Sequence, residues 1–145
     1  MRLTRAGEYG VRCIFFLAEN GKEKVVGRME IAKAMAIPEQ FLGKIAQQLA
    51  RSGFIEIIQG AKGGYRLLLP PERITLLDVV EAITGEIFLN DCVMRPDSCF
   101  RSPTCSIHRV WEKARKQLRE TLREATFAKM LKEEVCFSPL VISED

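Results

Sequence analysis

The sequence contains no apolar run of 18 residues, and its first ten residues, MRLTRAGEYG, contain no hydrophobic signal core. Membrane-spanning helices and secretory signals both require such segments, so we expect a cytoplasmic protein with no membrane association.

The chain also has one histidine, and no separate base and orienting residue accompany a cysteine. A cysteine-histidine hydrolase is therefore poorly supported, and we do not expect an enzyme.

Cysteine is the unusual component of what is present. Five cysteines are an odd number, and a reducing cytosol disfavours structural disulfides, so metal or redox chemistry is the better explanation. Three of the five, with the only histidine, lie in the stretch CVMRPDSCFRSPTCSIH, residues 92–108. Its many turn formers argue against a helix or a central strand. We expect a loop that gathers soft metal ligands.

Charge is distributed unevenly along the chain. The formal net charge is +3, but residues 1–66 hold eleven Lys and Arg against six Asp and Glu, whereas residues 67–145 hold eleven against thirteen. A polyanionic partner would therefore bind the first half.

Apolar periodicity predicts three helices in that first half. The first runs from Thr4 to about Asn20, with Cys13 on its buried face and Glu8 one turn from Arg12, where an ion pair is expected. The second covers residues 28–35, and Pro38 begins a third that extends to about residue 52.

The third predicted helix has two distinct stripes. Its core stripe is Phe41, Leu42, Ile45 and Leu49, and long donors form an outward stripe of Gln40, Lys44, Gln47 and Arg51. Two helices joined by a tight turn are typical of a helix-turn-helix, whose second helix reads the major groove of DNA.

A hairpin is predicted to follow these helices. Two β-rich runs, residues 54–58 and 65–69, flank QGAKGG, where Gly60, Gly63 and Gly64 supply positive φ and Lys62 lies at the tip. Glycine also lets a backbone approach a phosphate, so we interpret the hairpin as the wing of a winged helix. The alternative is a surface hairpin with a solvated lysine.

Two further helices are predicted. Thr75 and Asp78 resemble a capping box that begins a helix ending near Thr84, and Ser106 is the expected N-cap of a long final helix. The long helix carries an apolar stripe, which we interpret as a dimer interface rather than a surface folded on its own core. The expected interface residues are Ile107, Trp111, Ala114, Leu118 and Leu122.

The spacing of the thiols is Cys92-x6-Cys99-x5-Cys105, followed by His108 three residues later. Structural zinc sites usually pair cysteines two to four residues apart, which none of these gaps provides. An iron-sulfur cluster is larger, its ligands converge from a loop, and histidine can replace a thiolate. Cys105 and His108 also lie at the start of a helix, whose dipole favours an anionic cluster.

Together the opening MRLT-x2-GEY, the segment LARSGFI, the wing GAKGGYRL, the helix LLDVVEAI and the cysteine loop resemble the iron-sulfur cluster regulator family of winged-helix repressors. The resemblance covers residues 1 to about 130. It implies a homodimer that binds palindromic double-stranded DNA and holds a cluster at the dimer interface, with 2Fe-2S favoured over 4Fe-4S. It also implies that the thiolate ligands are Cys92, Cys99 and Cys105.

The fourth ligand has two candidates. His108 matches the histidine-ligated members, whereas Glu8 occupies the position from which other members recruit a carboxylate across the dimer. Imidazole is the softer and better-attested cluster ligand, so His108 is favoured. A cluster-free thiol sensor, or a regulator that acts by docking a metabolic enzyme, is the alternative function.

The expected DNA contacts and units complete the interpretation. Gln59 stands where several relatives place an arginine that enters the minor groove. We expect a winged helix-turn-helix over residues 1–85, a cluster-binding loop over 86–106, a dimerisation helix with a short closing helix over 107–134 and a flexible tail over 135–145. The expected DNA-binding residues are Arg2, Arg5 and Arg28 on phosphates, Gln40, Lys44, Gln47 and Arg51 in the major groove, and Gln59, Lys62 and Gly63 at the wing.

Overall fold

The computed structural model describes residues 3–133. They form a mainly helical structure with one two-stranded antiparallel hairpin, which confirms the expected fold class. No helix in this range is long and apolar enough to cross a membrane. In chain order the elements are α1 (Arg5–Asn20), α2 (Arg28–Met35), α3 (Glu39–Arg51), β1 (Ile55–Ile58), β2 (Gly64–Leu67), η1 (Pro71–Arg73), α4 (Leu76–Thr84), α5 (Asp91–Met94), η2 (Pro96–Ser98), α6 (Ser106–Glu124) and α7 (Phe127–Glu133).

Local capping explains where several helices begin and end. The Thr4 hydroxyl accepts a hydrogen bond from the Gly7 N–H at 3.0 Å and starts α1. Thr75 and Asp78 form the predicted capping box of α4, with hydrogen bonds of 3.0 and 3.1 Å. Ala36 takes a left-handed conformation, φ 53°, and turns the chain between α2 and α3.

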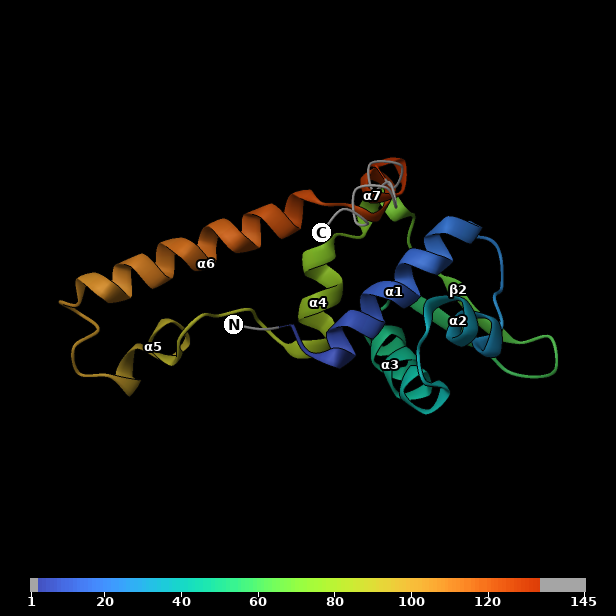
Figure 1. The fold of residues 1–145 in the computed structure, drawn as a ribbon, viewed down its shortest axis with the longest axis horizontal. Helices are drawn as coiled ribbons and strands as arrows, with labels where there is room; N and C mark the ends of the chain where they lie inside the picture. The colour runs from blue at the N-terminus through green and yellow to red at the C-terminus, as the bar shows by residue number, and fades with distance from the viewer. Residues whose placement is uncertain (1–2, 134–145) are drawn as a thin grey trace, which may run out of the picture.

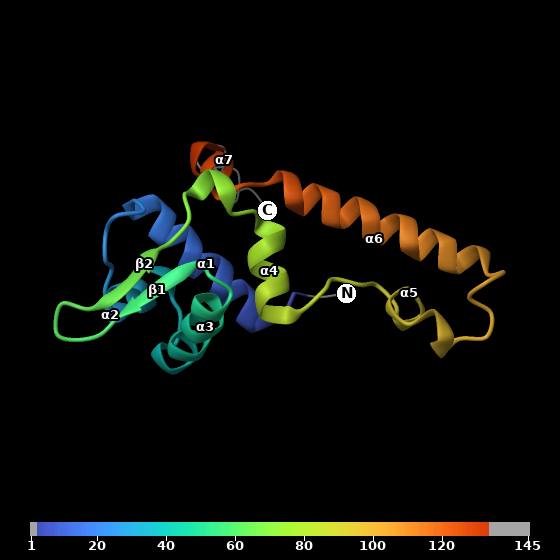
Figure 2. The same ribbon diagram turned by 180° about the vertical axis from the view of Figure 1, so that it is seen from behind.

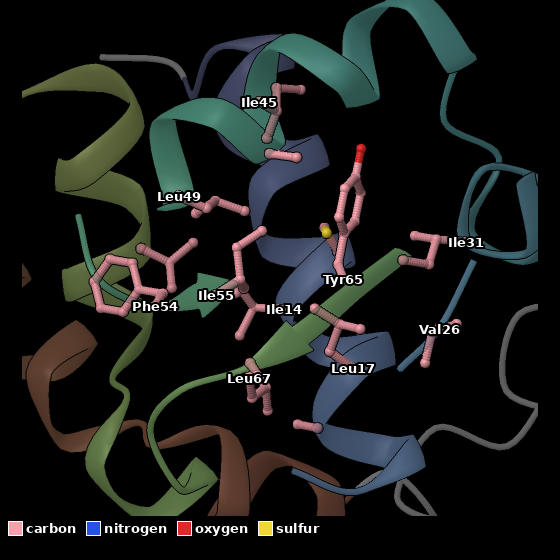
Figure 3. Close-up of a cluster of buried hydrophobic side chains, with 14 of the residues drawn as sticks. Ile14, Leu17, Val26, Ile31, Ile45, Leu49, Phe54, Ile55, Tyr65 and Leu67 are labelled. Atoms are coloured by element: carbon pink, nitrogen blue, oxygen red, sulfur yellow. The ribbon is translucent and has the colours of Figure 1, made fainter. Parts of the chain in front are cut away.

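Helix α1 lies at the centre of the winged half, which comprises residues 3–85 together with α7. It packs against α2, α3, α4, α7 and β2 (Figures 1 and 2). Figure 3 shows Ile14 and Leu17 of α1 facing Leu49 of α3 and the hairpin residues Ile55 and Leu67. The hairpin pairs Ile55 with Leu67 and Ile58 with Gly64, so its inner face completes this core.

Cys13 is part of the same core, as predicted. It is fully buried, and burial raises the pKa of its thiol to about 12. A thiol with so high a pKa is protonated at neutral pH and is a poor nucleophile or ligand.

The chain returns to the winged half after α6. The Phe127 N–H donates to the Ile74 carbonyl at 3.0 Å, and the Leu76 N–H donates to the Ala125 carbonyl at 2.8 Å. Phe127 is completely buried in the core. Helix α7 is therefore anchored on α1 and η1, so the winged half incorporates both ends of the described chain.

The segment from residue 86 to residue 124 forms an arm that extends away from the winged half. Figure 1 shows α6 as a long helix leaving the winged half, with α5 below its N-terminal end, and Figure 2 shows the same arrangement from behind. Towards the C-terminal end of α6, Leu118 and Leu122 pack beside Leu77 and Val80 of α4 and beside Ile87.

Several local predictions were wrong. Phe41 is 54% exposed and lies beside Tyr9, with ring centroids 6.3 Å apart, rather than in the core stripe. Glu8 approaches Arg5 at 3.8 Å, because Arg12 instead donates to the Met35 carbonyl at 3.2 Å. Long-range contacts decide both cases.

The boundaries near the cysteines also differ from expectation. Residues 91–94 form the short helix α5 and residues 96–98 a 3-10 turn, so this stretch is not wholly irregular. Cys105, rather than Ser106, is the N-cap of α6, and Pro38 precedes α3 as its N-cap instead of opening it. Arg2 and the predicted tail, residues 135–145, lie outside the described residues.

Candidate functional sites: a reading groove and a cysteine hollow

A groove of about 780 Å³ runs between α2, α3 and the hairpin; we call it the reading groove. Six of the predicted DNA-binding residues line it: Arg28, Gln40, Lys44, Gln47, Gln59 and Gly63. Arg5, Arg51 and Lys62 are exposed but do not line it. Long donors from the third helix and the wing thus share one concave surface, which suits contacts with base edges and phosphates.

The base of the wing is closely packed against the helices. Val26 and Tyr65 exchange two backbone hydrogen bonds of 2.9 and 2.8 Å, which tie β2 to the segment before α2. A Cβ on Gly64 would clash with the Val26 carbonyl, and Gly64 has φ 153°. Glycine is therefore required at residue 64 by both space and backbone conformation.

An acidic residue that sequence reasoning missed also lines the groove. Glu39, the first residue of α3, accepts a hydrogen bond from Arg28 Nη2 at 2.8 Å. The two residues are eleven positions apart and belong to different helices, so periodicity within one helix does not reveal the pair.

The three predicted thiolate ligands and His108 line a second, smaller depression of about 380 Å³; we call it the cysteine hollow. Cys92 lies on α5, Cys99 follows η2, and Cys105 and His108 are at the start of α6. All three thiols are free and partly buried. Asn90, Asp91, Ser98, Ile107 and Trp111 complete the lining.

The polar atoms around the cysteine hollow are compatible with a bound group. His108 is only 8% exposed, and its Nδ1 is buried without a hydrogen-bond partner among the described residues. Buried polar atoms are costly when unpaired, so the missing partner of His108 Nδ1 calls for an explanation. His108 Nε2 lies 3.5 Å from Glu112 Oε1.

The geometry does not match a site for one metal ion. Within residues 3–133 no three His, Cys, Asp or Glu side chains are grouped closely enough to hold a single ion. Glu8 does not line the hollow of its own chain.

A polar cluster that was not predicted joins the arm to α4. Arg119 donates to Glu81 through Nε at 3.0 Å and Nη2 at 2.7 Å, and the Ile87 N–H donates to the same carboxylate at 2.9 Å. Arg115 Nε donates to the Ile87 carbonyl at 2.8 Å. We call this cluster of Glu81, Ile87, Arg115 and Arg119 the α4–α6 latch. Glu81 and Arg119 are 38 residues apart, which explains why sequence patterns do not show it.

Electrostatics favour the ionised form of the latch. Burial alone raises the pKa of Glu81, but hydrogen bonds from Arg119 and Ile87, with the charges of Arg119 and Arg115, outweigh it and lower the pKa below its ordinary value of 4.5. The pKa of Arg119 is raised, mainly by its hydrogen bond to Glu81. Both partners are therefore charged at neutral pH.

The predicted interface stripe on α6 has two environments. Leu118 and Leu122 are partly buried against α4 of the same chain. Nearer the start of the helix, Val110 and Ile107 are each 60% exposed, and Trp111 is also exposed. An exposed apolar strip of this kind on a projecting helix suits a partner surface.

Comparisons with known proteins agree with this geometry. A family model described as "Rrf2: Iron-dependent Transcriptional regulator" matches residues 3–133. Protein aau3 of Rhizobium meliloti (strain 1021) is 35% identical over 133 residues, which cover 91% of this chain and 86% of that protein. The HTH-type transcriptional regulator NsrR of Geobacillus kaustophilus (strain HTA426) is 30% identical over 142 residues, 97% of each chain.

Solved structures lead to the same grouping. The structure of T. potens IscR matches with a TM-score of 0.76 at 27% identity and covers 95% of this chain and 93% of that one. CymR (YrzC), the global cysteine regulator of B. subtilis, has a TM-score of 0.77 at 23% identity over 90% of this chain and 95% of its own, which shows a shared fold. These matches confirm the resemblance, and they are to regulators of transcription rather than enzymes.

Proposed function

The chain belongs to the Rrf2 family of DNA-binding transcriptional regulators, and from this premise we propose that it is a homodimer whose operator affinity depends on a bound iron-sulfur cluster. One observation carries the proposal. Cys92, Cys99, Cys105 and His108 line one hollow. The cluster, 2Fe-2S in preference to 4Fe-4S, would supply a redox-sensitive centre. The four side chains would hold it.

The reading groove supports the DNA-binding role of individual residues. Gln40, Lys44 and Gln47 lie along α3 at the spacing that presents them to one groove, and we assign them to the major groove. Gln59 and Gly63 belong to the wing, and Lys62 at its tip is exposed for a phosphate contact. Arg5 and Arg51, exposed at the edges of the winged half, are assigned to phosphates.

The dimer is proposed to form through the N-terminal half of α6. Ile107 and Val110 leave a strongly apolar surface, and Trp111 adjoins it at the rim of the cysteine hollow. A symmetric pairing of two such helices would cover both strips and would place the two hollows near the interface. Ala114 continues the strip towards Leu118 and Leu122, which contact α4 of their own chain.

The latch supports a route from the cysteine hollow to the DNA-binding surface. Ile87 lies five residues before Cys92, and its N–H and its carbonyl are hydrogen-bonded to Glu81 and Arg115 of the latch. Helix α4 in turn packs against α1 and α3. Ordering the segment around a cluster would therefore set the position of α4 and α6. It would thereby set the distance between the two winged halves of a dimer on a palindromic operator.

The proposal is tested on protein purified without oxygen, by an absorption spectrum with iron and sulfide counts. We expect visible absorption with iron and sulfide bound in the wild type, and its loss in Cys92→Ala, Cys99→Ala and Cys105→Ala. Cys13→Ala is the matched control. The Cys13 thiol is buried in the core, away from the hollow, so the variant should keep the colour. A colourless, iron-free wild type would contradict the proposal. His108→Ala loses the colour if histidine is the fourth ligand, whereas Glu8→Ala loses it if the carboxylate is.

A cluster-free thiol sensor is the second candidate. It is favoured by the partly buried, free state of all three thiols around one hollow, where oxidation could link or modify them. An iron-free sample whose DNA affinity changes reversibly with thiol oxidation would establish this alternative.

A further inference from the structure

The side chain of Arg28 takes an unexpected path. Arg28 is the first residue of α2, yet its guanidinium lies on the surface of α3. Nη2 donates to Glu39 Oε1 at 2.8 Å, and a Cβ added at Gly43 would lie only 3.2 Å from Nη1. Glu39 and Gly43 are four residues apart, so they share one face of the first turns of α3. The guanidinium covers that face.

Gly43 is consistent with this arrangement. It lies in the interior of α3, where glycine is a poor helix former. Its backbone takes no positive φ, so no unusual conformation requires glycine there. The structure supplies a different reason: a side chain at residue 43 would crowd the guanidinium that reaches across from α2.

The wing contacts the same arginine. Tyr65 of β2 lines the reading groove together with Arg28, and Figure 3 shows its hydroxyl pointing away from Leu17 and Leu67. The hydrogen bond to Glu39 is the largest cause that raises the pKa of Arg28, and Tyr65 contributes to the same shift. Burial raises the pKa of Tyr65, and the charge of Arg28 partly offsets that effect. Arg28 thus stands where α2, α3 and β2 meet.

We propose that Arg28 is a specificity-determining residue that reads a guanine in the major groove. Glu39 is the positioning residue that holds the guanidinium of Arg28. The inference rests on the proposed DNA-binding role and changes the expected role of Arg28 from a phosphate contact to a base contact. The N-terminal turns of a recognition helix contact base edges, and the guanidinium lies on those turns. Its side chain is 49% exposed, which leaves donors free for the guanine O6 and N7.

Glu39 gives the arginine its fixed direction. A free arginine at a groove would sample many rotamers and would contact phosphates as readily as bases. The carboxylate accepts one hydrogen bond from Nη2, and both residues line the reading groove, so the pairing restricts the rotamers of the guanidinium beside the groove. Lysine carries the same charge but lacks the fork, so a substitution by lysine separates base reading from simple charge.

The test begins by selecting, from a pool of randomised DNA duplexes at one salt concentration, those that the whole chain binds. Kd values are then measured on the selected site and on its single-base variants. We expect the wild type to enrich a guanine at one position of each half-site. Arg28→Lys and Arg28→Ala should lose the preference at that position alone, so that discrimination of about 5- to 150-fold falls to near 1. Glu39→Gln should reduce the same preference by a smaller factor.

Lys132→Ala is the matched control, since it removes one exposed positive charge from α7, away from the reading groove. It should keep the guanine preference, and circular dichroism should show that all variants are folded. The inference is overturned if Arg28→Ala keeps the same selected sequence and weakens every duplex equally with a shallower salt dependence, which is the result expected of a phosphate contact. If the wild type selects no sequence at all, the proposed DNA recognition is wrong, and the proposed role of Arg28 is wrong as well.

Discussion

Replacing Glu81 with glutamine isolates the contribution of the α4–α6 latch. Glutamine has nearly the same shape as glutamate, but it carries no charge and has one acceptor oxygen instead of two. The Glu81 carboxylate accepts two hydrogen bonds from Arg119 and one from the Ile87 N–H, so the substitution leaves part of this set without an acceptor.

The magnitude follows from the burial of the pair. The side chains of Glu81 and Arg119 are 17% and 23% exposed, so solvent screens their interaction less than at an open surface. Hydrogen bonds to charged groups contribute about 1.5–3 kcal/mol, and we expect Glu81→Gln to lower the free energy of unfolding by roughly 2 kcal/mol. The matched control is Glu86→Gln, because Glu86 is half-exposed and lies 3.4 Å from Arg115. An exposed ion pair of this kind contributes about 0–1 kcal/mol.

Two assays check the role of the latch. Chemical denaturation of cluster-free protein at a fixed protomer concentration measures the stability change. Operator affinity is measured with and without the cluster to test the coupling between the two sites. We expect the two Kd values to differ by about 5- to 150-fold in the wild type, and this ratio to fall towards 1 in Glu81→Gln. The reasoning is refuted if Glu81→Gln matches Glu86→Gln in stability and retains the wild-type affinity ratio.

Three further predictions concern other parts of the molecule. The stabilising effect of Glu81 should be complete above its ordinary pKa of 4.5 and should be lost progressively as the pH falls from there through its lower folded pKa. The acid loss of stability should be smaller in Glu81→Gln. Val110→Glu places a charge in the exposed strip of α6 and should convert the dimer to a monomer in sedimentation while the winged half stays folded; an unchanged dimer would place the interface elsewhere. Iodoacetamide should alkylate Cys92, Cys99 and Cys105 of native, cluster-free protein but leave Cys13 unmodified until the protein unfolds, because Cys13 is fully buried and burial raises its pKa to about 12; rapid labelling of native Cys13 would contradict this core assignment.

Local signals were sufficient for much of the winged half. The predicted α1 and α4 agree with the structure because Thr4 and the Thr75–Asp78 capping box mark their first turns within three residues of sequence. The hairpin was found for the same reason, since its glycines and its two β-rich runs are adjacent in the chain. Such features depend on neighbours along the sequence, which periodicity and capping rules describe.

Several missed features depend on contacts between distant residues. Phe41 follows the apolar spacing of α3 but lies beside Tyr9 at the surface, so only the placement of α1 against α3 reveals its exposure. Arg12 reaches the carbonyl of Met35, which its spacing from Glu8 does not indicate. The cysteine hollow is an intermediate case. Its four candidate ligands were identified by residue type and spacing, whereas their convergence required the turn formed by α5, η2 and α6.

The most direct test of the proposed switch is the operator affinity of cluster-loaded and cluster-free protein, measured without oxygen on one selected duplex at one salt concentration. Ordering of the segment between Ile87 and α6 is proposed to set the distance between the two winged halves of the dimer. We therefore predict that the Kd values of the loaded and cluster-free forms differ by about 5- to 150-fold. The same cluster-free affinity should be reached by Cys92→Ala, Cys99→Ala and Cys105→Ala. Equal Kd values for the loaded and cluster-free forms would contradict the account even if the cluster is present.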